Sequence, residues 1–106
     1  MDTIPPLSLP ILLDGATGSE LYKRGMPAGA CTEQWVLGHP EALLELQRGY
    51  VAAGGQVLLA PTFGANRVRL EQHGIFGQVA DYNRRLVELS RQAAGGRALV
   101  AGDMAP

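Results

Sequence analysis

The sequence predicts an α/β fold built on a parallel sheet, and three short apolar runs support this prediction. The runs lie at residues 11–13, 56–60 and 98–102, and each is continuous, as expected for strands buried on both faces. The segments between them are long enough for helices, which predicts a parallel βαβαβ order with crossover connections. This order is typical of a doubly wound sheet and of the first strands of a (β/α)8 TIM barrel, and the spacing alone fits both.

The first part of the chain alternates irregular segments with one short helix. Prolines 5, 6 and 10 predict an irregular N-terminal arm over residues 1–10. A short helix is predicted over 17–24, with Thr17 as its N-cap and Glu20 at the capping-box spacing. Residues 26–39 have no periodic pattern and predict a loop.

Three further helices are predicted before the third strand. Pro40 opens the clearest of them, because proline is preorganised for the first helical position. The apolar stripe of this helix consists of Leu43, Leu44, Leu46, Tyr50 and Val51. Gly54 and Gly55 end it, a short helix is predicted over 67–73, and a longer one over 79–94.

Composition excludes several classes of function. The 106 residues suffice for one small domain, and 46% hydrophobic with 18% charged residues is ordinary for a globular protein. A net charge of −1 without a basic tract argues against a nucleic-acid or anionic-membrane partner. The apolar runs are far shorter than the roughly 20 residues that span a bilayer. One cysteine and no targeting signal predict a cytoplasmic protein.

Candidate ligand-binding residues follow each predicted strand, at the ends where parallel α/β proteins bind ligands. Asp14 and Gly15 follow the first strand, and the turn 62–66 follows the second. In that turn Thr62 offers a hydroxyl, Phe63 an apolar wall, Gly64 room for a close approach, and Asn66 an amide or a helix cap. Asp14 is suited to bind a substrate ammonium or, equally, the amides of its own turn. Asp103, after the third strand, is interpreted as a loop-bonding residue.

Two other kinds of site are not supported by the residues. The turn 15–20 lacks the lysine of a phosphate loop, and Glu20 would repel an anion there. Cys31, His39 and His73 are far apart in the sequence and show no metal-ligand spacing, so no metal site is predicted. No catalytic residue is assigned.

Four ordered motifs resemble the N-terminal part of the homocysteine S-methyltransferase family. They are the turn "DGATGS" at 14–19, the helix and strand from "PEALLELQRGY" to "AAGGQ" at 40–56, the turn "TFGAN" at 62–66, and "GDMAP" at 102–106. The resemblance covers nearly the whole chain from residue 11. Where family members often carry E-T-N before the T-F pair, this chain has Leu59, Ala60 and Pro61.

The resemblance implies a (β/α)8 barrel that transfers a methyl group to the thiolate of homocysteine, forming methionine. Asp14 and Gly15 are then expected to hold the amino-acid end of homocysteine, and Thr62 and Phe63 to line the same pocket. Family members use zinc held by three cysteines that lie further along the chain, so zinc is expected for a full-length member and not for this chain alone. The methyl donor stays open between a corrinoid protein, a methylfolate-derived group, a sulfonium and a betaine.

Residues 11–106 are therefore expected to be a partial homocysteine-binding barrel, truncated after its third strand and inactive alone. The alternative is a small α/β interaction module that completes its barrel with another chain, or self-associates through its open edge. A continuing reading frame after codon 106 would favour the first hypothesis.

Overall fold

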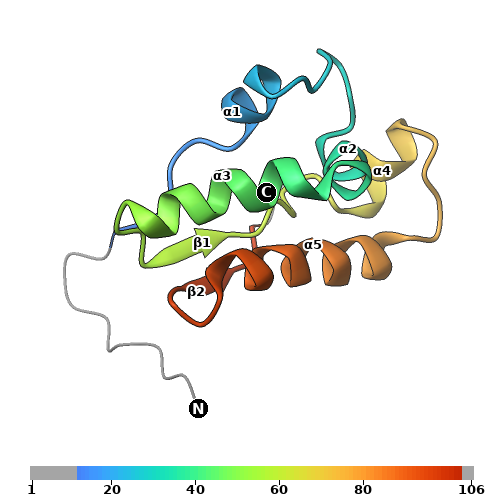
Figure 1. Cartoon of the computed structure of the whole chain (residues 1–106). Coiled ribbons are helices and arrows are strands. Elements are labelled where there is room, and N and C mark those ends of the chain that lie inside the picture. The colour runs from blue at the N-terminus through green and yellow to red at the C-terminus, as the bar shows by residue number, and fades with distance from the viewer. Residues whose placement is uncertain (1–11, 104–106) are drawn as a thin grey trace.

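The computed structural model describes residues 12–103, and its centre is a short parallel sheet packed against two long helices (Figure 1). Strand β1 (Val57–Leu59) pairs in parallel with β2 (Leu99–Ala101), with Val57 opposite Leu99. The helices are α1 (Gly18–Lys23), α2 (Thr32–Gly38), α3 (Pro40–Ala52), α4 (Arg67–Gln72) and α5 (Val79–Ala94). The predicted α/β class with a parallel sheet is confirmed. Within residues 12–103, no helix is both long and apolar enough to cross a membrane.

The first predicted strand is reduced, in the described residues, to one parallel bridge between Leu13 and Val57. The Asp14 N–H donates to the Val57 carbonyl at 3.0 Å as part of this pairing. Leu12 and Leu13 are 54% and 53% exposed, so the prediction of burial on both faces is wrong for them. They lie beyond β1 at the sheet edge, with no other strand of residues 12–103 beside them. The predicted arm 1–10 and Ile11 lie outside the described residues.

Helix α2 corrects the predicted loop over 26–39. Its seven residues are too few for a periodic pattern, and its burial depends on contacts with distant parts of the chain. Val36 is fully buried in a cluster that also contains Leu86 of α5. His39 ends α2 and is followed directly by Pro40, which disfavours helical geometry in the residue before it and then starts α3 as predicted.

Helix α1 lies where it is predicted, but the capping box does not form. The Thr17 side chain makes no capping hydrogen bond. Its backbone is helical (φ −107°, ψ −54°), whereas a capping side chain needs an extended residue. Glu20 instead pairs with Lys23 at 3.2 Å and with Arg24 at 3.6 Å.

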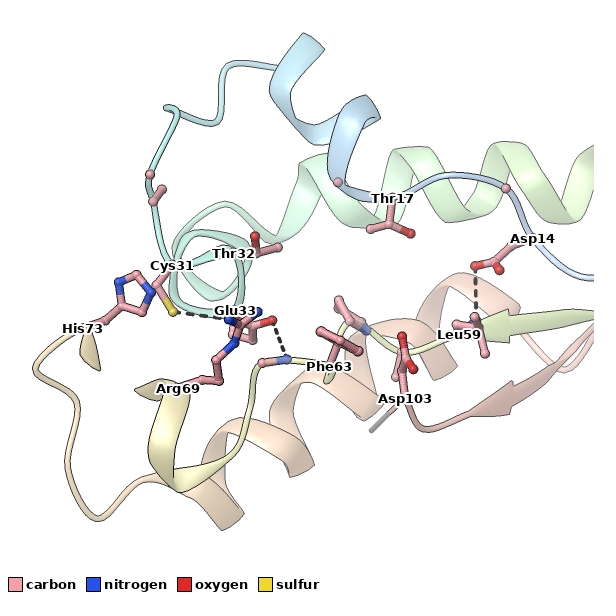
Figure 2. Close-up of a pocket in the computed structure, with 17 residues that line it drawn as sticks. Asp14, Thr17, Cys31, Thr32, Glu33, Leu59, Phe63, Arg69, His73 and Asp103 are labelled. Atoms are coloured by element: carbon pink, nitrogen blue, oxygen red, sulfur yellow. Dashed lines mark hydrogen bonds between the residues drawn. The ribbon is translucent and has the colours of Figure 1, made fainter. Parts of the chain in front are cut away.

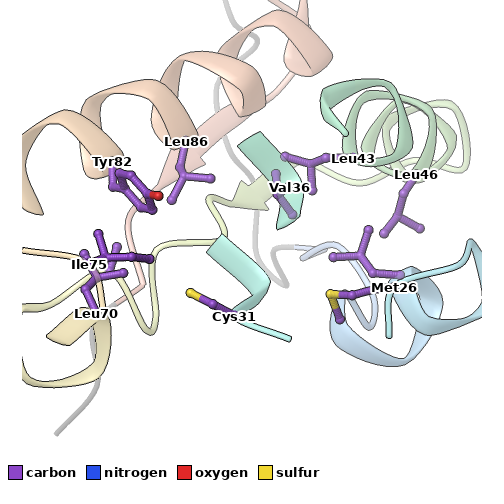
Figure 3. Packing of buried hydrophobic residues seen from close by; sticks show 11 residues of the cluster. Met26, Cys31, Val36, Leu43, Leu46, Leu70, Ile75, Tyr82 and Leu86 are labelled. Carbon is purple, nitrogen blue, oxygen red and sulfur yellow. The ribbon is translucent and has the colours of Figure 1, made fainter. Parts of the chain in front are cut away.

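Two hydrophobic clusters hold the helices to one another and to the sheet. The larger one joins all five helices and includes Val36, Leu43, Tyr82 and Leu86 (Figure 3). The smaller one lies between the sheet and the helices α3 and α5, and contains Leu44, Leu58, Ala93, Ala94 and Ala98. The predicted apolar stripe of α3 is confirmed, with Leu43, Leu44 and Leu46 buried. Both long helices therefore pack against the strands whose carboxyl ends form the site.

Candidate substrate-binding site

The carboxyl ends of the strands open onto a cleft of about 600 Å³, a volume in the usual range for small-molecule sites. Asp14 and Gly15 reach it from the first strand position, Phe63 and Gly64 from the turn after β1, and Asp103 from the end of β2. In the view of Figure 2, Phe63 lies between Asp14 on one side and Glu33 on the other. The three strand ends singled out from the sequence thus meet at one cavity.

Asp14 is a half-buried carboxylate that is bonded to the neighbouring strand. Its Oδ2 accepts the N–H of Leu59 at 3.1 Å (Figure 2). Burial raises the pKa of Asp14 above its ordinary value of 3.8, and the charge of Asp103 acts in the same direction. The Leu59 N–H opposes this shift, because it favours the ionised form. Since a carboxylate accepts about four hydrogen bonds, Asp14 retains capacity for a ligand donor.

Gly15 lies directly against the ring of Tyr50 in α3. A Cβ added at this position would lie 2.8 Å from the Tyr50 Cε1 atom, which real Cβ atoms do not tolerate. The Tyr50 hydroxyl also donates to the carbonyl of Ala16, one residue further. The glycine therefore lets the segment after Asp14 lie flat on α3.

Thr62 and Phe63 are adjacent in sequence but have different surroundings. The Thr62 hydroxyl is buried, donates to the Asp103 carbonyl at 2.8 Å and accepts from the Asp103 N–H at 2.9 Å. It ties two strand ends together and does not line the cleft. Phe63 does line it, and the Arg69 guanidinium lies 5.9 Å from its ring centre. A substrate-binding role for either residue stays a prediction.

Of the two roles predicted for Asn66, the helix cap is confirmed. Its side chain accepts the N–H of Arg69 at 2.9 Å and so caps α4. Its amide nitrogen lies 3.4 Å from the Phe63 carbonyl, within the same turn. Asn66 thus shapes the turn after β1, and it does not itself line the cleft.

Glu33 is a cleft residue that was not predicted from the sequence. It is only 9% exposed; its Oε2 accepts the Gly64 N–H at 3.1 Å, and its Oε1 lies 3.6 Å from the Cys31 sulfur (Figure 2). A Cβ on Gly64 would lie 2.7 Å from Oε1, so this carboxylate requires a glycine opposite it. In the sequence, the one feature that could have indicated Glu33 is its place as an acidic residue in the first turn of α2, a helix that was predicted as a loop.

The residues tested for a metal do not come together as a ligand set. Cys31 and His73 both line the cleft. The Cys31 thiol, however, donates a hydrogen bond to Glu33, and burial raises the pKa of this thiol. His39 stacks on Trp35 with ring centres 4.2 Å apart, and its Nδ1 lies 2.9 Å from the Trp35 carbonyl. Across residues 12–103, no group of three or more His, Cys, Asp or Glu side chains is arranged to hold a metal ion.

Replacing Asp14 with asparagine should stabilise the fold at neutral pH. The raised pKa means that the folded state binds the Asp14 proton more tightly than the unfolded state. The stability that the bound proton gives to the folded state is fully present below the ordinary pKa of the Asp14 carboxyl group. It is lost as pH rises through the folded-state pKa of that group. We therefore expect Asp14→Asn to raise the free energy of unfolding at pH 7, by less than about 1 kcal/mol for a half-exposed group, and to change it little at about pH 3.5. Urea unfolding at both pH values measures this, and Asp81→Asn, which removes two exposed ion pairs, is the control of opposite sign.

Comparison with known proteins identifies the family. The family model described as homocysteine S-methyltransferase matches residues 11–106. The chain belongs to the homocysteine S-methyltransferase family. It is 38% identical over 100 residues to betaine–homocysteine S-methyltransferase 1 of Bos taurus, and 35% identical over 94 residues to S-methylmethionine–homocysteine S-methyltransferase BHMT2 of Pongo abelii. Both matches cover 87% of this chain and 24% of the relative.

A solved homocysteine methyltransferase structure has a similar fold over this region. The metallated form of the homocysteine methyltransferase MmuM from Escherichia coli superimposes with a TM-score of 0.76 and 27% identity. The match covers all of this chain and 38% of that one. The chain spans about a quarter of the length of the curated relatives named above. Zinc, which the family implies, does not fit residues 12–103, because the chain has one cysteine and these residues hold no three-ligand cluster.

Proposed function

We propose that the chain forms the first strands of a (β/α)8 barrel and supplies the amino-acid-binding side of a homocysteine pocket. The observation that carries this proposal is Asp14, a half-buried carboxylate held at the mouth of the cleft by the Leu59 N–H. The chain belongs to a family whose relatives are named for homocysteine. A carboxylate with free acceptor capacity in a partly desolvated cleft suits an α-ammonium group.

Three cleft residues have a stated role in this proposal. Asp14 accepts hydrogen bonds from the substrate ammonium, and the Gly15 backbone helps to hold the same amino-acid end. Phe63 packs against the methylene groups of the homocysteine side chain. In the reaction, a lone pair on the thiolate sulfur of homocysteine forms a bond to the methyl carbon of the donor. The bond between that carbon and the rest of the donor breaks, and the donor leaves with the electron pair of the broken bond. The described residues orient the amino acid for this step and supply no metal ligand set, so the chain alone is expected to be inactive.

A chimera tests the proposal. The segment of bovine betaine–homocysteine S-methyltransferase 1 that matches this chain is replaced by residues 11–106. We expect the purified chimera to bind homocysteine and to form methionine from betaine. The same protein with the segment deleted is the control and should do neither. Circular dichroism and zinc content show that the chimera has folded.

The opposite result would favour the alternative function. A folded, zinc-loaded chimera that does not bind homocysteine would contradict the proposal. It would point to an interaction module whose exposed edge, marked by Leu12 and Leu13, pairs with another chain. Homocysteine binding by the chimera therefore separates the two functions.

A further inference from the structure

Helix α3 directs two polar side chains toward the surroundings of Asp14, Gln47 toward β1 and Tyr50 toward the segment that follows Asp14. Gln47 and Tyr50 are three residues apart and therefore share one face of the helix. Gln47 is fully buried, and its Nε2 donates to the Leu59 carbonyl at 3.0 Å. Its Oε1 accepts the hydroxyl of Ser90, also fully buried in α5, at 2.8 Å. The buried amide is thus committed to defined partners at both its nitrogen and its oxygen.

Leu59 connects this buried pair to the cleft. Its carbonyl accepts from Gln47, and its N–H donates to Oδ2 of Asp14. The last residue of β1 is therefore held from two sides, by an amide in the core and by a carboxylate at the cleft. A displacement of Leu59 would alter the contact that fixes the Asp14 carboxylate.

Tyr50 contacts the two residues that follow Asp14 in the chain. Its ring lies under Gly15, and its hydroxyl bonds the Ala16 carbonyl, so the two residues after Asp14 both rest on Tyr50. Gln47 acts on the strand that donates the hydrogen bond to Asp14, and Tyr50 acts on the segment that presents the carboxylate. One helix face thus controls both partners of a single hydrogen bond.

We propose that Gln47 and Tyr50 are positioning residues that hold the Asp14 carboxylate against the Leu59 N–H and aim it into the cleft. As a substrate-positioning role, this inference rests on the proposed function of Asp14. Neither side chain lines the cleft, so both act through backbone groups and not by touching the substrate. Ser90 supports Gln47 by fixing the orientation of its amide.

Proton NMR of the isotopically labelled 106-residue chain tests this inference without homocysteine. An amide that donates to a carboxylate changes its chemical shift as that carboxylate titrates. We expect the Leu59 amide proton to follow the titration of the Asp14 carboxyl group between about pH 3 and 7. Tyr50→Phe and Gln47→Met should each reduce the amplitude of this response to roughly half or less, because the hydrogen bond is then populated for less of the time.

Two control variants separate positioning from general loss of packing. Asn83→Leu removes an amide that donates to the backbone carbonyls of Ala65 and Val79, and Tyr82→Phe removes a hydroxyl from a core tyrosine. Both should leave the Leu59 response unchanged. Unchanged amplitude in Tyr50→Phe, or an equal loss in the controls, would overturn the inference. If Gln47→Met does not fold, Tyr50→Phe decides alone. Failure of the chimera to bind homocysteine is a different result and overturns only the proposed function.

Discussion

Removing the Asp14 side chain from the chimera should raise the KM for homocysteine by about 10- to 150-fold. This range corresponds to the roughly 1.5–3 kcal/mol that a hydrogen bond to a charged group contributes. The loss should appear in KM more than in kcat, because the ammonium is bound equally in the ground state and the transition state. Steady-state kinetics of the Asp14→Ala chimera, with homocysteine varied at saturating betaine, measures the effect.

The Asp14→Asn chimera separates the effect of the carboxylate charge on homocysteine binding from the effect of the shape of the side chain. Asparagine can still accept the Leu59 N–H through its side-chain oxygen, so the local geometry of β1 should be kept. If the carboxylate charge binds the ammonium, the Asp14→Asn chimera should lose nearly as much affinity as the alanine variant. A KM within about twofold of the unsubstituted chimera for both variants would assign Asp14 to its own turn, the interpretation that the residues left open.

The expected effect of Asp14→Asn on stability is opposite to its effect on binding. The carboxylate is partly desolvated and close to Asp103, so its ionised form is costly in the free chain. A ligand ammonium would offset that cost by supplying the missing positive charge. Gain of stability with loss of affinity in one variant is characteristic of a binding residue, whereas a purely structural Asp would lose stability when it is replaced.

The parts of the fold that could be predicted from the sequence are those with local causes. Pro40 and the double glycines mark the ends of the long helices, and continuous apolar runs mark β1 and β2. Leu13 shows the limit of this reasoning. Its run is as apolar as the others, but burial depends on a neighbour on both sides, and only the Val57 side is occupied in residues 12–103.

The candidate site was predictable in place and less so in detail. The strand-end rule indicated Asp14, Gly15 and Phe63, and all three line the cleft. The same rule could not show that the Thr62 hydroxyl turns toward the Asp103 backbone, because 41 residues separate the two. Glu33 was missed for a related reason: its partner Gly64 lies 31 residues away, and α2 is too short to have a periodic signature.

Leu86→Ala should lower the free energy of unfolding by about 2–5 kcal/mol, the cost of emptying a fully buried leucine site. Leu86 is completely buried in the larger cluster, with Val36 of α2, Leu43 of α3 and Tyr82 of α5 in the same cluster (Figure 3). Because a domain of this size has only about 5–15 kcal/mol in total, the loss is a large fraction of its stability. Urea unfolding should show a lower midpoint with an unchanged slope.

Val68→Ala is the matched control for Leu86→Ala, because Val68 is an aliphatic helix residue that is 64% exposed. It should change stability by no more than about 0.5 kcal/mol. A loss below about 1 kcal/mol for Leu86→Ala would mean that the residues around it collapse into the space or that α5 does not pack as tightly as its burial indicates. The second possibility bears on the site, because α5 carries Ser90, which fixes Gln47 behind β1. A loosely packed α5 would also weaken the Leu59 response to Asp14, so the stability and NMR results must agree if α5 and α3 together support the cleft.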